Sequence, residues 1–164
     1  YETSLTLVRS VENRAEEAGT LTDLGDLWRA VGDHTQAMEF YKQALDLAGA
    51  HHLALQEAGA LSGMGMSYYE TGKKRQAARE LEKGLEAAKK ARSSREVANL
   101  SYRLALVLCK QGRWDKAEPH AQLAQRVYGR IADTAMEERS TAMLERIQQN
   151  KGKSTGFFQN LLES

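Results

Sequence analysis

The stretch LTDLGDLWRAVGDHTQAMEFYKQAL, residues 21–45, decides the fold that the sequence predicts. Its first half carries an apolar stripe at helical spacing, Gly32-Asp33 then interrupts the helix, and a second apolar stripe follows. The stripes consist of Leu21, Leu24, Trp28 and Val31, and of Ala37, Tyr41, Ala44 and Leu45. The stretch therefore predicts a hairpin of two helices, with Gly25 and Ala37 as the contact points where the backbones approach closely.

The same pattern returns at an interval of 40 residues. The turn glycines Gly32, Gly72, Gly112 and Gly152 keep this interval, as do two sets of small residues, Gly25, Gly65 and Ala105, and Ala37, Ala77 and Ala117. Self-similarity of this length is typical of an array of helix hairpins that share one continuous core.

These residues resemble the tetratricopeptide repeat. The first copy is carried by Leu24-Gly25, Trp28, Gly32, Ala37, Tyr41 and Ala44-Leu45, the second by Met64-Gly65, Tyr68, Gly72, Ala77, Leu81 and Leu85, and the third by Leu104-Ala105, Leu108, Gly112, Trp114, Ala117 and Ala124. The period exceeds the usual ~34 residues, as in a long-helix subclass similar to Pins/LGN-type cell-polarity adaptors and kinesin light chains. The resemblance implies an all-α, right-handed superhelical solenoid of antiparallel helix hairpins that binds proteins and is not an enzyme.

The repeat interval divides the chain into segments. We expect the end of a truncated preceding repeat at 1–12, repeats at 13–52, 53–92 and 93–132, and a divergent repeat or C-terminal cap at 133–164. Residues 10–13 are expected to form a weak turn, and residues 151–153 to break the last long helix before a short helix over 154–162. Because Tyr1 stands 40 residues before Tyr41, the chain is expected to be a fragment of a longer protein.

Composition gives little support to several functional classes. The net charge is +1, which does not favour nucleic acid or an anionic membrane. The single cysteine, Cys109, favours a reducing, intracellular and cytoplasmic location, and a thiol that packs or lines a groove. His51 and His52 are adjacent and lack the spacing of metal ligands on a helix. We find no catalytic constellation and predict no cofactor and no metal.

The expected site is the concave surface lined by the first helices of the hairpins. Its predicted lining consists of Asp26, Arg29, Met66, Tyr69, Asn99, Tyr102, Arg103, Leu106, Arg139 and Arg146. Arginines beside tyrosine, methionine and leucine suit an acidic peptide with apolar anchors. The predicted function is that of an adaptor, or of the regulatory part of a larger protein, whose groove binds a peptide or helix of a partner.

Two other hypotheses remain open at this stage. The chain could be a sensor or self-association module that binds its own flanking domain or dimerises through Phe157, Phe158, Leu161 and Leu162. Nucleic-acid binding by an arginine-lined groove is the weakest alternative, because the charges of the chain are nearly balanced.

Overall fold

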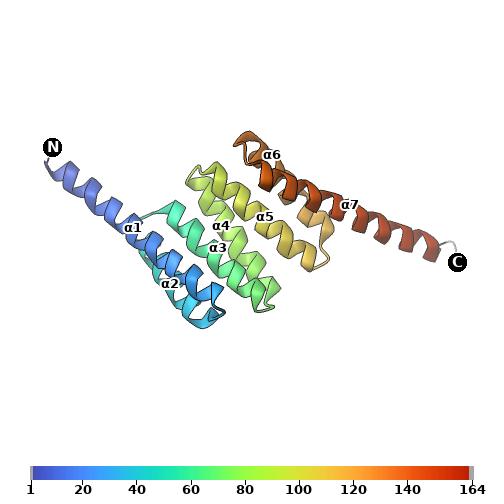
Figure 1. The fold of residues 1–164 in the computed structure, drawn as a ribbon, viewed down its shortest axis with the longest axis horizontal. Coiled ribbons are helices and arrows are strands. Elements are labelled where there is room, and N and C mark those ends of the chain that lie inside the picture. Colours follow the sequence, from blue (N-terminus) through green and yellow to red (C-terminus); the bar gives the residue numbers. More distant parts are fainter. Residues whose placement is uncertain (1, 163–164) are drawn as a thin grey trace. The chain divides into compact units, whose positions relative to one another are not determined.

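The chain is all helical in its computed structural model, which describes the backbone of residues 2–162 and the side chains of residue 10 and residues 13–152. The helices are α1 (Glu2–Ala30), α2 (His34–Ala50), α3 (Ala54–Glu70), α4 (Lys74–Lys90), α5 (Ser94–Lys110), α6 (Trp114–Arg130) and α7 (Thr134–Leu162) (Figure 1). No strand occurs in residues 2–162, which confirms the predicted all-α fold of helix hairpins.

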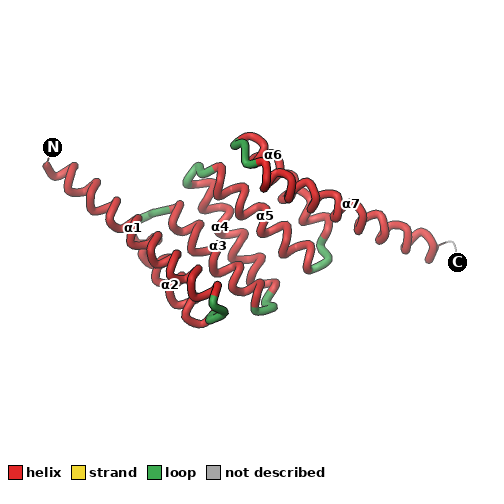
Figure 2. Tube along the Cα trace, viewed as in Figure 1, coloured by secondary structure: helices red, strands yellow, loops and turns green. Residues whose placement is uncertain are grey.

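Short turns join the helices (Figure 2, green). They follow the repeat interval and are of two kinds. Each turn of the first kind contains a glycine with a positive φ: Gly32 at 87°, Gly72 at 78° and Gly112 at 73°. Glycine fits here because a Cβ atom is strained at positive φ. The second kind places His52, Arg92 and Ala132 at φ values of 54° to 56°. The predicted turn glycines are therefore confirmed at the first three positions.

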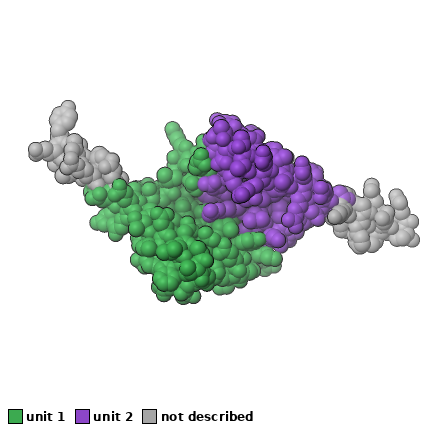
Figure 3. All heavy atoms as spheres, in the orientation of Figure 1, with its two compact units in different colours: residues 1–96 green, residues 97–164 purple. Residues whose placement is uncertain are grey.

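Two compact units make up the chain, residues 1–96 and residues 97–164 (Figure 3). In unit 1, α1 packs on α2, α3 packs on α4, and α3 also contacts α1 and α2. The buried core of unit 1 is built largely from small side chains, among them Ala37, Ala44, Ala48, Ala58, Ala60, Ala77 and Ala88. Small residues allow the helix axes to approach closely, so large side chains are needed at few positions.

Tyr41 is the largest fully buried side chain of unit 1. Its ring lies against Gly25 of α1, where an added Cβ would come within 2.5 Å of the Tyr41 Cε1 atom. Gly25 is thus a point of close approach between α1 and α2, and the side chain that it accommodates is the Tyr41 ring. In the next hairpin the close approach does include the alanine, since a Cβ on Gly65 would lie 3.3 Å from the Ala77 carbonyl oxygen.

Unit 2 is held by a core cluster between its helices. Ala98 of α5 packs with Ala124, Val127 and Tyr128 of α6, and Met136 of α7 packs against them. Lys151 of α7 pairs with two carboxylates of α6, Glu118 at 2.6 Å and Asp115 at 3.0 Å. These contacts fix α7 along α6 over the length that carries the site described below.

Two predicted helix breaks are wrong. The expected turn at residues 10–13 lies inside α1, because that segment contains neither glycine nor proline to interrupt the helix. The expected break at residues 151–153 lies inside α7, which continues to Leu162 without a short separate helix. Phe157 stands in the sequence where the other repeats have alanine. If the chain turned back after Gly152, the next helix would lack the small residue that lets two helices pack closely.

The first apolar stripe is also placed differently from the prediction. Leu24, Trp28 and Val31 were expected to be packed, but 36%, 37% and 67% of their surfaces are exposed. The buried side of α1 is instead formed by Ala18 and Gly25. Small residues let α1 pack against its neighbours on that side, and the large apolar residues point away from it.

Candidate partner-binding site

A cavity of about 320 Å³ opens in unit 2 between α5, the start of α6, and α7. Its lining residues are Tyr102, Leu106, Cys109, Lys110, Trp114, Arg139, Ala142, Met143 and Arg146. Spacings of three and four residues along α5 and α7 bring these side chains onto one face of each helix. Four predicted site residues, Tyr102, Leu106, Arg139 and Arg146, are therefore brought together around one cavity.

The charged residues that line this cavity have one sign. Lys110, Arg139 and Arg146 are cationic, and none of the described side chains that line the cavity is an aspartate or a glutamate. Arg139 and Arg146 are exposed, and the Arg139 guanidinium reaches the Met136 sulfur at 3.9 Å. Guanidinium groups that stay in water can pair with a carboxylate in two parallel hydrogen bonds without a large desolvation cost. The cavity can accordingly accept an anionic group at its rim.

The other walls are apolar. Leu106, Trp114 and Met143 are all partly buried and lie among the lining residues. Trp114 is the first residue of α6, directly after the turn at Gly112, and so closes one end of the cavity. An apolar side chain of a ligand would gain contact area here, because aromatic and methionine side chains give large, adaptable surfaces.

Cys109 also lines the cavity, as the sequence predicts for a groove-lining thiol. Burial raises the pKa of the Cys109 thiol above its ordinary value, and the positive charge of Arg146 opposes this effect. The thiol is therefore mainly protonated near neutral pH and is a poor nucleophile. This agrees with a lining role and gives no support to covalent chemistry.

Two predicted site residues of unit 2 lie outside this lining. Asn99 accepts a hydrogen bond from the Tyr128 hydroxyl group at 2.7 Å, which ties α5 to α6. Arg103 is partly buried on α5. The second contact predicted at Phe157, Phe158, Leu161 and Leu162 falls on side chains outside the described residues.

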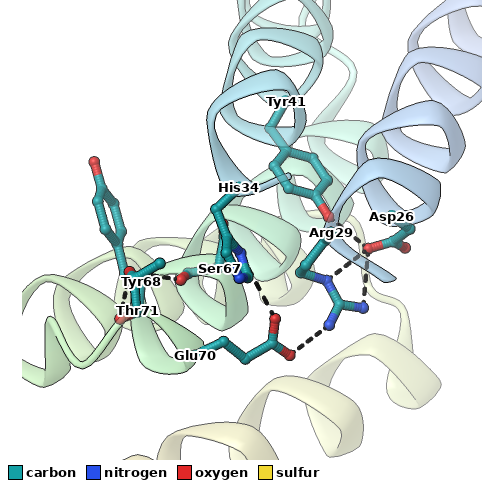
Figure 4. A network of polar contacts seen from close by, with 8 residues as sticks. All are labelled: Asp26, Arg29, His34, Tyr41, Ser67, Tyr68, Glu70 and Thr71. Carbon is teal, nitrogen blue, oxygen red and sulfur yellow. Dashed lines mark hydrogen bonds and ion pairs between the residues drawn. The ribbon is translucent and has the colours of Figure 1, made fainter. Parts of the chain in front are cut away.

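Two of the four predicted site residues of unit 1, Asp26 and Arg29, belong to a polar network (Figure 4). Arg29 pairs with Asp26 of the same helix at 3.4 Å and with Glu70 of α3 at 2.6 Å. Asp26 in turn accepts a hydrogen bond of 2.6 Å from the Tyr41 hydroxyl group. The positive charge of Arg29 is thus compensated by two carboxylates of the protein itself. Met66 and Tyr69 are partly buried on α3 in the same unit.

The network continues to the start of α2. His34 approaches the Ser67 hydroxyl oxygen at 3.1 Å and the Glu70 carboxylate at 3.9 Å. Three helices therefore meet at one polar cluster, in which Glu70 contacts both Arg29 and His34 (Figure 4). This arrangement orients α1 on α3 and is a structural feature of unit 1.

Sequence reasoning missed three of the cavity residues: Lys110, Trp114 and Met143. The repeat pattern predicts a packing role for Trp114, although His34 and Lys74 occupy its place in the earlier repeats. A tryptophan where other repeats carry a polar residue is the signal that could have revealed the closed end of the cavity. Lys110 and Met143 lie beside the predicted stripes on α5 and α7 and carried no separate signal.

The described residues show neither a group of three metal-ligating side chains nor a helix that could cross a membrane.

Comparisons with known proteins identify the class of fold. The family model of the tetratricopeptide repeat matches residues 18–52. No curated protein matches the chain in sequence. Two similar solved structures are the aspartyl phosphate phosphatase F of Bacillus subtilis, with a TM-score of 0.76 and 14% identity, and the apo form of RapI, with a TM-score of 0.76 and 16% identity.

Those matches cover 87% and 98% of this chain but only 38% and 60% of the two proteins. The TPR-like repeats of a Podosopora anserina protein assigned as a kinesin light chain match with a TM-score of 0.65 and 17% identity, over 89% of this chain and 72% of that one. At such identities the likeness shows the fold alone. The chain has the TPR-like helical-repeat fold.

Proposed function

We propose that this chain is a non-catalytic interaction module whose cavity in unit 2 binds an acidic segment of a partner protein. The observation that carries the proposal is the combination of three cationic residues with apolar walls in one cavity without a carboxylate. An acidic segment would pair its carboxylates with Arg139 and Arg146 and insert one apolar side chain toward Leu106 and Trp114.

The size of the cavity supports an anchored segment. Its volume of about 320 Å³ lies at the lower end of the range for small-molecule pockets, which is about 300–1,000 Å³. It has room for one large side chain, and the remaining partner residues would lie along the exposed faces of α5 and α7. Tyr102 supplies a further aromatic contact at the same cavity.

The predicted contacts of unit 1 have a smaller part in this proposal. Arg29 already pairs with Asp26 and Glu70, so a partner carboxylate would have to compete with two internal ones. Met66 and Tyr69 remain proposed partner contacts within unit 1 and Arg103 one within unit 2, whereas Asn99 contributes by fixing α5 against α6.

The proposed biological role is that of an adaptor, or of the regulatory part of a larger protein, in a reducing intracellular compartment. Support comes from the fold and from the fact that the chain spans 38% and 60% of two structurally similar proteins. The similarity to a kinesin light chain supports the long-period subclass of repeats. The likeness to Pins/LGN-type adaptors stays a prediction.

Peptide binding to the full chain tests the proposal. Two labelled peptides share a central leucine, one flanked by aspartate and glutamate and the other by lysine. We expect the acidic peptide to bind, to weaken as salt increases, and to lose at least about tenfold in affinity with Arg139→Ala plus Arg146→Ala, because two charged contacts are removed.

A matched control removes two other exposed arginines of the same unit, Arg126 and Arg130 on α6. Arg126→Ala plus Arg130→Ala lowers the net charge equally but leaves the cavity intact. Equal affinity for the acidic and basic peptides, or an equal loss in both double variants, would contradict the proposal.

A further inference from the structure

A second surface, on α1 of unit 1, carries large apolar side chains that are partly exposed. We call Leu24, Leu27, Trp28 and Val31 the α1 stripe; their exposed fractions are 36%, 60%, 37% and 67%. Spacings of three and four residues place them on one face of the helix. Adjacent large apolar residues that stay this exposed are typical of a surface that binds another protein.

The repeat interval shows what kind of partner fits this surface. The residues 40 positions later than Leu24 and Leu27 are Met64 and Ser67 of α3, which are only 7% and 1% exposed. Met64 is covered by α2, whose Ala37 and Tyr41 belong to the same core cluster. The Leu24 and Leu27 part of the α1 stripe therefore corresponds to a face that α2 covers in the second hairpin. Tyr68 and Thr71, the counterparts of Trp28 and Val31, are partly buried and exposed, respectively.

Charge indicates the chemistry of that helix. Glu17 lies two helical turns before Leu24 and Glu16 three turns before Leu27, and both glutamates are exposed. Glu17 pairs with Arg14 at 2.7 Å, so one arginine and two glutamates leave this end of the stripe with a net negative charge. A helix that lies on α1 as α2 lies on α3 runs antiparallel to it, with its C-terminal end beside these glutamates. Basic residues in the last turn of such a helix would also suit its own dipole.

We propose that the α1 stripe docks an amphipathic helix of a partner protein that has a small-residue and leucine face and basic residues in its last turn. A second copy of this chain fits less well. In an antiparallel pair of α1 helices the acidic end would face the end that carries Asp33, and in a parallel pair it would face itself. Both arrangements place like charges together.

The chain itself provides a probe with these properties. The sequence of α4, residues 74–90, has Ala77, Leu81 and Leu85 on its buried face and ends in Lys89-Lys90. A synthetic peptide of this sequence, stapled through the exposed positions 79 and 83 to hold the helix, would be titrated into the full chain. Trp114→Phe leaves Trp28 as the only tryptophan, so the shift of its emission reports burial of the stripe.

We expect a blue shift of Trp28 emission and a saturable affinity that falls at least about tenfold with Leu27→Asp plus Val31→Asp, because the apolar contacts are lost. Both residues are more than half exposed, so the double variant should keep its helicity. Leu55→Asp is the matched control, since Leu55 is 46% exposed on α3 outside the stripe, and it should bind as the parent does. A peptide with Lys89→Glu plus Lys90→Glu should bind several-fold more weakly.

Three outcomes would overturn the proposal. The first is no shift of Trp28 emission, and the second is equal binding by the stripe variant or by the charge-reversed peptide. The third is a dimer of the chain alone in sedimentation that Leu27→Asp plus Val31→Asp dissociates, because a second copy would then occupy the stripe.

Discussion

The ring of Tyr41 on α2 occupies the space that a side chain on Gly63 of α3 would need. A Cβ atom added at Gly63 would lie far inside van der Waals contact with Cε1 of Tyr41. Gly25 of α1 faces the same ring, so one aromatic side chain is enclosed by glycines of two helices. The packing of three helices in unit 1 therefore depends on the absence of two Cβ atoms.

Gly63→Ala should lower the free energy of unfolding by about 1–3 kcal/mol, the usual cost of overpacking a core. Neither the buried tyrosine ring nor the backbone of α3 can move far without disturbing α1 or α2. Chemical denaturation followed by circular dichroism measures the change.

Gly59→Ala, in the same helix, is the matched control. Its added Cβ would meet only the Thr22 methyl group, at an ordinary distance of 3.8 Å. We expect a gain of about 0.5–1 kcal/mol, because alanine is the better helix former. A similar response of the two variants would show that the Tyr41 ring does not limit the approach of α3.

Tyr41→Phe should lower the free energy of unfolding by about 1 kcal/mol, because Asp26 loses the hydrogen bond of 2.6 Å from the hydroxyl group. Burial raises the pKa of Tyr41, and the neighbouring Asp26 carboxylate raises it further, so the hydroxyl group stays protonated and keeps donating at alkaline pH. Tyr68→Phe is the comparison variant, because it also removes a tyrosine hydroxyl group in unit 1 but leaves the bond to Asp26 in place. Equal stability of the parent and Tyr41→Phe would contradict the role given to this bond.

Ser101→Ala should raise the free energy of unfolding by about 1 kcal/mol. The Ser101 hydroxyl group is fully buried and has no hydrogen-bond partner in the part of the chain that the structure describes, so alanine removes an unsatisfied polar group and favours the helix. Ser140 is equally buried but donates to the Met136 carbonyl oxygen at 2.8 Å, so Ser140→Ala should gain less. Equal gains in thermal denaturation would mean that the burial of the Ser101 hydroxyl group costs nothing.

Cys109 should react slowly with iodoacetamide at pH 7. Its reaction rate should begin to rise at a higher pH than the rate of a free cysteine. The reason is that burial raises the pKa of the thiol. Arg146→Ala should slow the reaction further at each pH, because the positive charge that favours the thiolate is removed. Mass spectrometry of the alkylated chain gives the rates, and a faster reaction of Arg146→Ala would contradict the electrostatic assignment.

The helix hairpins follow directly from local sequence. The turn glycines Gly32, Gly72 and Gly112 and the small residues in phase with them have a strong local effect on the backbone, so the period alone locates six helix ends. The position of Tyr102 and Leu106 beside the cavity also follows from helical spacing, because the stripe opposite the packing face of α5 has to face outward.

Features that depend on neighbouring elements were not predictable in this way. The spacing of Leu24, Trp28 and Val31 shows a stripe but not which side of α1 has a neighbour. The pairing of Arg29 with Glu70 joins residues 41 positions apart and depends on how α1 lies on α3. The break expected near Gly152 failed because a glycine permits a turn but does not require one.

The measurement that tests the central claim most directly is the protection of Cys109 by an acidic peptide with an apolar anchor. The peptide would be added to saturation before alkylation with iodoacetamide, beside the lysine-flanked peptide at the same concentration. Binding in the cavity predicts that the acidic peptide slows alkylation of Cys109 severalfold and that Arg139→Ala plus Arg146→Ala abolishes the protection. Binding of the acidic peptide with no change in the alkylation rate would place the site elsewhere on the chain and contradict the account.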